Sequence, residues 1–380
     1  LTFTTAPVAN TTFFAVVFGD MQATGTPSDG TVLPVSIATG LDFTFNSVSV
    51  GKGANSVSGN TVLGENALDD SVSGGNNVAI GKAALGALTS GAQNVAIGGL
   101  CLDAVTTATY NTGIGYAAGS ALTTGAFNTI LGGNALTTAV GANNNVAVGY
   151  NSMNVTTSGF ENVAVGFAAL DANTSGSTNV AVGNNALTAS TTASNNTAVG
   201  NAALGANTTG TQNTAVGADA LDSNTTGSFN VAVGHDALQA NITGTYNVGI
   251  GQTALGANTG TGNTAIGGGA LEANTSSGNN TAVGHNALAD NTTGGGTAVG
   301  SFSLYVSTTG TANTAVGHNS LGSNTTASNN TAVGDYALQA NTTGADNVAI
   351  GSAALDSNTT ASNNPAIGRL DLQANTTGGT

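Results

Sequence analysis

The sequence predicts an all-β fold, a β-solenoid (parallel β-roll) of about 19 coils in which each coil is one 17-residue repeat. A related unit returns every 17 residues along most of the chain. A period of about 20 residues is typical of solenoids, because such a unit is too small to fold alone. The repeat is rich in Gly and Thr, which oppose helix, and its Val, Ile and Thr residues cluster in short runs, which favours strands.

The repeat can be written N-[TV]-A-[VI]-G-x-x-A-L-x-x-N-T-T-G-x-x, and we number its residues as positions 1 to 17. Position 5 is Gly in all 19 copies, and position 4 is always Val, Ile or Leu. One residue is missing before Asn263 and another before Gly296, in Gly/Thr-rich segments where a loop shortens at little cost. The copies begin at Asn60, Asn77, Asn94, Asn111, Asn128, Asn145, Asn162, Asn179, Asn196, Asn213, Asn230, Asn247, Asn263, Asn280, Gly296, Asn313, Asn330, Asn347 and Asn364.

Each copy is expected to form one coil, and the copy that begins at Asn213 serves as the example. Asn213 and the four residues after it are predicted to be extended, with Val216 in the strand and Gly217 at a corner. The x-x-A-L segment that ends at Leu221 is predicted to be a second short strand, and Asn-Thr-Thr-Gly is predicted to be a turn. Nineteen coils stacked at about 4.8 Å would make a rod of roughly 90 Å.

The first strand of the repeat is apolar on both faces, as in Val-Ala-Val at 163–165. This pattern is typical of a strand that is buried on both sides. A thin solenoid has a single interior, so the second apolar face indicates a neighbouring chain. The expected partner of the chain is therefore itself, as a homotrimer or as a polymer.

The chain divides into three predicted parts. Residues 1–45 hold six of the eleven Phe and three of the four Pro, which favours a separate β-rich module for capping, attachment or assembly. Residues 46–59 are interpreted as a degenerate first coil, and residues 60–380 as the rod. Pro365 takes position 2 of the last copy and cannot donate a ladder hydrogen bond, so that coil is predicted to be a boundary of the rod.

Charge and hydropathy exclude two classes of partner. Eighteen acidic residues against three basic ones give a net charge of −15, which repels nucleic acid and anionic lipid. No apolar run approaches the roughly 18 to 20 residues that span a bilayer, so no membrane insertion is expected. Cys101 is the single cysteine, which rules out an internal disulfide framework, and it is interpreted as a small buried hydrophobe.

The three histidines, His235, His285 and His318, all occupy position 6 and so form one column. Two coils, or about 9.6 Å, separate the closest pair, which is too far for two ligands of one ion. They are interpreted as solvated or packed corner residues, and the alternative is a ring in which copies of one His surround an ion on a threefold axis. No cofactor is expected. The acidic residues are scattered and form no catalytic constellation, so no enzymatic activity is expected.

Two further columns of side chains have alternative interpretations. Asn-x-Ser/Thr sequons at position 12 are either turn residues that bond the neighbouring backbone or glycan acceptors in a glycosylating host. Aromatic residues either lock neighbouring coils or chains together or bind sugars. The sequons include Asn207, Asn224, Asn241, Asn291, Asn324, Asn341 and Asn358. The aromatic columns contain Tyr110, Phe127, Phe229 and Tyr246 at position 17 and Tyr116, Tyr150 and Phe167 at position 6.

The run N-T-A-V-G-x-x-A-L-x-A-N-T-T-G resembles the repeats in the shafts of phage tail fibres and of related tail-fibre-domain surface proteins. More distantly, N-x-x-A-V-G resembles the head repeats of trimeric autotransporter adhesins. The resemblance covers residues 60–380 and implies a parallel homotrimer, extracellular, on a cell surface or on a virion. It also implies that the rod displays a receptor-binding end, whose partner would be a host-surface glycan or receptor.

Three functions remain open from the sequence. The first is a structural and adhesive fibre subunit. The second is a self-polymerising extracellular filament, in which the N-terminal module of one subunit caps the last coil of the next. The third is ice binding by Thr ladders, which is disfavoured because adjacent Thr residues, as at Thr208 and Thr209, point to alternate faces of an extended segment.

Overall fold

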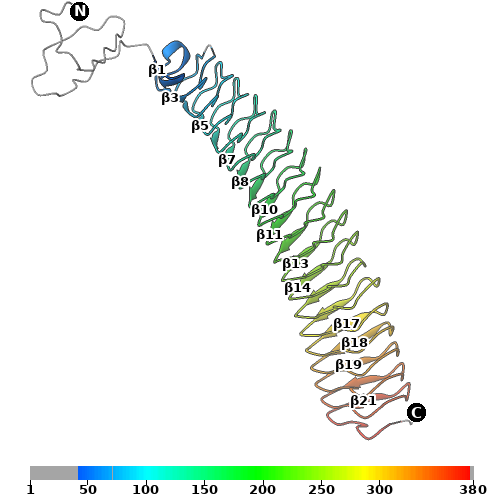
Figure 1. Ribbon diagram of the computed structural model, residues 1–380. Coiled ribbons are helices and arrows are strands. Elements are labelled where there is room, and N and C mark those ends of the chain that lie inside the picture. The colour runs from blue at the N-terminus through cyan, green and yellow to red at the C-terminus, as the bar shows by residue number, and fades with distance from the viewer. Residues whose placement is uncertain (1–41, 71, 377–380) are drawn as a thin grey trace, which may run out of the picture.

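The computed structural model describes residues 42–70 and 72–376, which form a long, gently curved β-solenoid (Figure 1). The rod has about 18 turns of about 17 residues. The 3-10 helix η1 (Ala54–Ser56) is the one helical segment in the described part of the chain. The strands are β1 (Phe43–Phe45), β2 (Val48–Gly51), β3 (Thr61–Gly64), β4 (Val78–Ile80), β5 (Val95–Ile97), β6 (Thr112–Ile114), β7 (Thr129–Leu131), β8 (Val146–Val148), β9 (Val163–Val165), β10 (Val180–Val182), β11 (Thr197–Val199), β12 (Thr214–Val216), β13 (Val231–Val233), β14 (Val248–Ile250), β15 (Thr264–Ile266), β16 (Thr281–Val283), β17 (Gly296–Val299), β18 (Asn313–Val316), β19 (Thr331–Val333), β20 (Val348–Ile350) and β21 (Pro365–Ile367).

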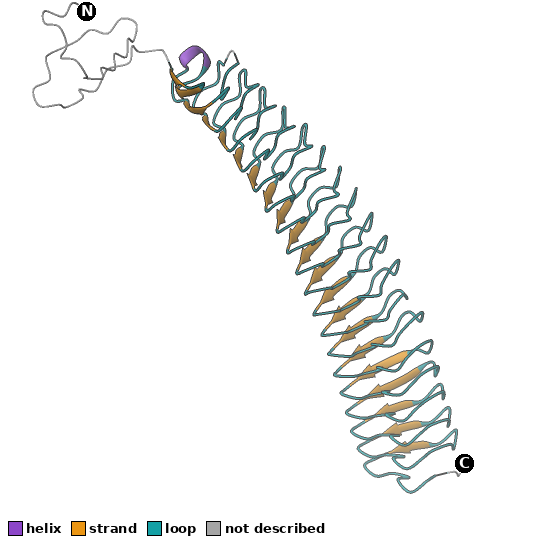
Figure 2. Ribbon diagram, in the orientation of Figure 1, coloured by secondary structure: helices purple, strands orange, loops and turns teal. Residues whose placement is uncertain are grey.

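Strands β3 to β21 form one parallel sheet that runs along one side of the rod, while turns make up the opposite side (Figure 2). Each strand pairs with the strand of the next repeat at equal positions, so that Val180 lies beside Thr197 and Thr214 beside Val231. The two one-residue deletions leave this register intact, because Val248 still pairs with Thr264 and Thr281 with Thr297. The missing residues are therefore absorbed in the turns.

The strands are shorter than the five extended residues expected, because most contain only positions 2 to 4. Alternation of side chains across a strand sends position 3 to one face and positions 2 and 4 to the other. In β12, Ala215 is fully buried while Val216 is 38% exposed. Ala faces the interior because the coil is thin, and the aliphatic residues at position 4 face outward.

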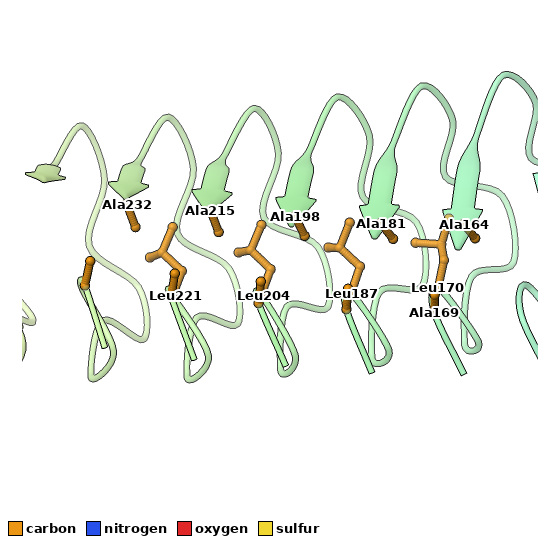
Figure 3. Close-up of a cluster of buried hydrophobic side chains, with 14 of the residues drawn as sticks. Ala164, Ala169, Leu170, Ala181, Leu187, Ala198, Leu204, Ala215, Leu221 and Ala232 are labelled. Carbon is orange, nitrogen blue, oxygen red and sulfur yellow. The ribbon is translucent and has the colours of Figure 1, made fainter. Parts of the chain in front are cut away.

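The core consists of small and branched side chains in columns. The Ala residues of the strands point towards Leu and Ala residues that come from the opposite wall of each coil, as Ala215 and Leu221 illustrate (Figure 3). All of these side chains are fully buried. Equal positions stack on each other from coil to coil, so each column is filled by the same residue type.

Two exceptions in the core compensate for each other in volume. Position 9 is Gly119 instead of Leu, and position 3 of the next copy is Ile130 instead of Ala. A Cβ at Gly119 would lie 2.8 Å from Cδ1 of Ile130, so the larger side chain fills the space that the missing Leu leaves. Gly113 makes room in the same way for Cys101, whose Sγ would lie 2.7 Å from an added Cβ.

The x-x-A-L segment is not a strand, and the prediction of a second strand is wrong. Positions 7 and 9 have positive φ in nearly every coil, at 57° for Asp219 and 53° for Leu221. These left-handed residues alternate with others and keep the segment from extending. Its amide groups still bond to both neighbouring coils, with Asp219 N donating to Asn201 O and Leu221 N to Ala237 O. The x-x-A-L segments of successive coils are therefore hydrogen-bonded to each other, as strands in a sheet are, although they are not extended.

Position 5 requires glycine because of its backbone angle and its closeness to the next coil. Gly217 has φ of 137°, which side chains rarely allow. A Cβ at this residue would also lie 2.4 Å from Gly234 O of the next coil. From Gly64 to Gly351, the close approach of the next corner therefore keeps position 5 free of side chains.

A small antiparallel unit covers the first parallel strand. β1 and β2 form an antiparallel pair, and β2 runs antiparallel to β3. The Asp42 carboxylate accepts hydrogen bonds from Lys52 N and Gly53 N, both at 2.7 Å. Residues 46–59, interpreted from the sequence as a degenerate first coil, thus contain β2 and η1 and differ from the parallel coils.

Two sequence predictions concern the ends of the chain. Residues 1–41 of the expected N-terminal module lie outside the described residues, so the module stays a prediction. Pro365 opens β21, which pairs in parallel with β20. Across the residues that the structure describes, no helix has the length and apolar character needed to traverse a bilayer.

The paired exceptions at Gly119 and Ile130 give a double-mutant test of core packing. We expect Gly119→Leu alone to lower stability by roughly 1–3 kcal/mol, because the new side chain overlaps Ile130. Gly119→Leu with Ile130→Ala restores the consensus pair and should recover most of that loss. Thermal unfolding followed by circular dichroism measures both. A double variant no more stable than Gly119→Leu alone would contradict the compensation.

Candidate functional site

Asparagine at position 1 closes each coil and joins it to the next. Asn213 Nδ2 donates to Gly227 O at the end of the same coil, at 2.8 Å. Its Oδ1 accepts from Asn230 N of the next coil at 2.9 Å and from Asn230 Nδ2 at 3.1 Å. Asn213 is 1% exposed and Asn230 is fully buried. The side-chain amide therefore makes in each coil the hydrogen bond that the backbone ladder would otherwise supply.

Gly296 is the natural exception in this column. Gly296 N still donates to Asn280 Oδ1 at 2.8 Å, but the residue has no side chain to offer the next coil. The backbone substitutes, since Gly296 pairs directly with Asn313 and both β17 and β18 are four residues long. A missing side-chain amide is thus replaced by one more residue of strand.

The sequon asparagines at position 12 form a second buried column. Asn224 Nδ2 donates to Asn207 Oδ1 at 2.8 Å and to Gly227 O at 3.0 Å. The same two kinds of bond recur at Asn241, Asn341 and Asn358. Asn207, Asn224, Asn241, Asn291, Asn324, Asn341 and Asn358 are all fully buried. A glycan on the Nδ2 atom of any of these asparagines would force that side chain out of its buried place in the folded coil.

Threonine at position 13 supports the same corner. Thr208 N and Thr208 Oγ1 both donate to Thr225 O of the next coil, at 2.9 and 3.0 Å. The second Thr of the pair, such as Thr209, is exposed. The Asn-Thr-Thr-Gly turn is therefore an internally bonded corner that presents one Thr per coil to solvent.

The outward face of the parallel sheet is an exposed apolar surface, which we call the strand face and define as positions 2 and 4 of β3 to β21. Position 2 is Thr, Val or, once, Pro, and position 4 is aliphatic in every copy. Many position 4 side chains are more than a third exposed, including Val199, Val216, Val233, Ile250, Ile266, Val299, Val316 and Val333. No residue of the strand face is charged. Soluble monomers rarely expose a contiguous apolar patch of more than a few hundred Å², and longer apolar surfaces often mark an interaction site.

The aromatic columns form stacked pairs between successive coils. Tyr110 stacks on Phe127 at 5.1 Å between ring centroids, and Phe229 stacks on Tyr246 at 4.9 Å. Tyr150 and Phe167 stack at 6.0 Å. One face of each ring is therefore covered by its partner, while the pairs stay half exposed. These contacts add coil-to-coil attraction of about 0.5–1.5 kcal/mol per pair.

The three histidines lie in different coils and have different partners. His235 Nδ1 lies 2.7 Å from Asp236 Oδ2, and His318 Nδ1 lies 3.2 Å from Asp335 Oδ1. His285 packs edge-on against Phe302, with centroids 5.3 Å apart. One chain does not bring the three rings together, so the ring on a threefold axis stays a prediction. Asp219 joins His235 and Asp236 in a group that the sequence analysis did not identify.

Burial perturbs several titratable groups of the rod. Burial raises the pKa of the Cys101 thiol to about 12, so this thiol stays protonated and is a poor nucleophile or metal ligand at neutral pH. Burial also raises the pKa of Asp171, and a hydrogen bond with the Asn154 side chain opposes this rise. One buried Asp171 oxygen has no hydrogen-bond partner among the described residues. The folded coil therefore leaves the Asp171 carboxylate incompletely hydrogen-bonded.

No protein-family model matches the chain, and no curated protein matches it either.

The Gly296 exception predicts how the position 1 column responds to substitution. Asn213→Asp should destabilise the rod by roughly 1–3 kcal/mol or more, because an acceptor then faces Gly227 O in a buried site. Asn213→Gly should be tolerated better, since the backbone can pair as it does at Gly296. Thermal unfolding compares the two variants. Equal stability of Asn213→Asp and the unmodified chain would contradict the role of the amide.

The raised pKa of Asp171 predicts a pH-dependent gain from removing its charge. A carboxyl whose pKa is higher in the folded state disfavours folding when the pH is above that pKa, and it has no such effect below the unfolded value of about 3.9. Asp171→Asn should therefore stabilise the rod at pH 7, with the gain disappearing towards pH 4 or below. Asp69→Asn, at the same position of another coil but exposed, is the control. A gain that does not change with pH would argue against this cause.

Proposed function

We propose that the chain is a structural and adhesive fibre subunit whose rods associate side by side through the strand face. The observation that supports this most directly is the uninterrupted outward row of aliphatic side chains from Leu63 to Ile367. Burying about 25 cal/mol per Å² of such surface favours association. The row runs the length of the rod, so parallel copies can bury it along their whole length.

The proposed assembly is a parallel homotrimer, extracellular, on a cell surface or on a virion. The number three rests on the resemblance of the repeat to phage tail-fibre shafts. Three strand faces turned towards a common axis would each be covered, and the turn corners would face solvent. The corners carry the polar and charged side chains, such as Lys82 and Glu65, which form an exposed ion pair at 3.3 Å. This distribution of apolar and polar surface is the one that side-by-side association needs.

The role proposed for the rod is to hold a receptor-binding end away from a base. A stack of coils, each hydrogen-bonded to both neighbours, is stiff. The alternative proposal is a filament in which residues 1–45 of one subunit cap the last coil of another. It is the less favoured because β1, the described part of that module, already pairs with β2 of its own chain.

The trimer is tested by mass and by charged substitutions on the strand face. Native mass spectrometry of the full chain should give three times 36.2 kDa. Val216→Asp with Val233→Asp should give a monomer, because both side chains are exposed in one rod and would be buried in the assembly.

The matched control is Thr226→Asp with Thr243→Asp, which places two charges on exposed turns of the same two coils. This control should remain trimeric, and circular dichroism should show that both variants keep the fold. A stable monomer for the unmodified chain rules the trimer out. Long particles that depend on residues 1–45 would favour the filament instead.

A further inference from the structure

We propose that Asp219, His235 and Asp236 form a binding site for one Zn²⁺-like transition-metal ion on each chain. The inference is independent of the fibre role, because it uses residues of two successive coils of a single rod. It also differs from a ring of histidines on a threefold axis, which would take one ligand from each of three chains.

The first observation is the geometry of the three side chains. One ligand atom from each of Asp219, His235 and Asp236 lies within 4.8 Å of the other two. His235 Nδ1 and Asp236 Oδ2 are 2.7 Å apart. Two ligands of a tetrahedral zinc ion with bonds of about 2.0–2.1 Å lie roughly 3.3 Å apart. Small side-chain rotations therefore place all three atoms around one ion.

The second observation is how the backbone holds these residues. Asp219 and Asp236 both occupy position 7, one coil apart, and both have φ of 57°. Asp219 N donates to Asn201 O at 3.0 Å and Asp236 N to Ala218 O at 3.2 Å, so the two residues sit in equivalent places on adjacent coils. Their carboxylates are thus stacked in register by the solenoid. Position 7 is acidic in these two copies and in no other copy of the repeat.

The third observation is that the chain supplies no fixed positive charge to this site. Carboxylates held side by side in adjacent coils repel, as like charges opposite each other on paired strands do. Asp222, whose backbone N donates to Asp219 O at 3.3 Å, adds to the negative charge. Lys82 and Arg369 are each at least eight coils away along the repeat, roughly 40 Å at strand spacing. A bound cation would offset the repulsion that the register imposes.

The ligand types select the class of ion. Ca²⁺ and Mg²⁺ prefer oxygen ligands alone, whereas an imidazole with carboxylates suits Zn²⁺ and neighbouring transition metals. Three protein ligands leave at least one position for water. His235 is 56% exposed at its side chain and Asp236 is 24% exposed, so an ion can reach the site directly from solvent.

The site can be tested with Zn²⁺ alone on the full chain. Calorimetric titration should give one Zn²⁺ per chain, and Co²⁺ should give the visible absorption of a nitrogen- and oxygen-ligated ion. His235→Ala and Asp219→Asn should each weaken the binding at least about tenfold, a change of about 1.4 kcal/mol. Both substitutions lie on the surface of the coil, and circular dichroism should confirm that the rod stays folded.

The matched controls are His318→Ala and Asp335→Asn. His318 and Asp335 also form a close histidine–carboxylate pair, at 3.2 Å, but they belong to no three-ligand group among the described residues. Both controls should bind Zn²⁺ as the unmodified chain does. The absence of saturable binding, equal binding by His235→Ala, or equal loss in His318→Ala would overturn the proposal. One Zn²⁺ per three chains would overturn it in favour of the threefold ring.

Discussion

The hydrogen bond from one position 1 asparagine to the next fixes the register of the whole rod. Asn213 Oδ1 accepts from the backbone and side-chain nitrogens of Asn230, while its own amide holds Gly227 O. A slip of one residue would break these bonds and turn the inward Ala of every strand outward. Because the register is fixed, residues at the same position of the repeat stack in a column along the rod. The residue type at each position therefore sets the polarity of one stripe of the surface.

The sequence was sufficient to predict the coils, their number to within about one, and the identity of the main columns. Invariant Gly at position 5 and aliphatic residues at position 4 are visible in the repeat, and their causes are the tight corner at Gly217 and the outward face that carries Val216. The second wall could not be predicted, because a short x-x-A-L run between two turns is compatible with a short strand. Only the backbone angles reveal that Leu221 and Asp219 are left-handed. The buried state of the sequon asparagines was equally hidden, since Asn in a turn is usually exposed.

The candidate metal group of Asp219, His235 and Asp236 shows why contacts between different positions of neighbouring repeats are hard to predict from the sequence. The sequence analysis compared the histidines with each other, along position 6, and found them too far apart. The structure places His235 beside residues of position 7 in its own and the preceding coil. The signal that could have revealed this was the pair of acids at Asp219 and Asp236, exactly one repeat apart. In a solenoid, residues that differ by one period and by one position are neighbours, so both comparisons are needed.

The core of each coil is thin, so the coil's interior offers little room for further apolar burial. Each coil buries a few Ala and Leu side chains, and Gly119 with Ile130 shows that even one misplaced side chain needs a compensating change. A core this narrow cannot gain stability by taking larger residues, because the two walls are too close together. Additional apolar burial is available on the strand face, where the side chains already exist and the register already aligns them. The proposed side-by-side association would bury this apolar surface without any change to the coil.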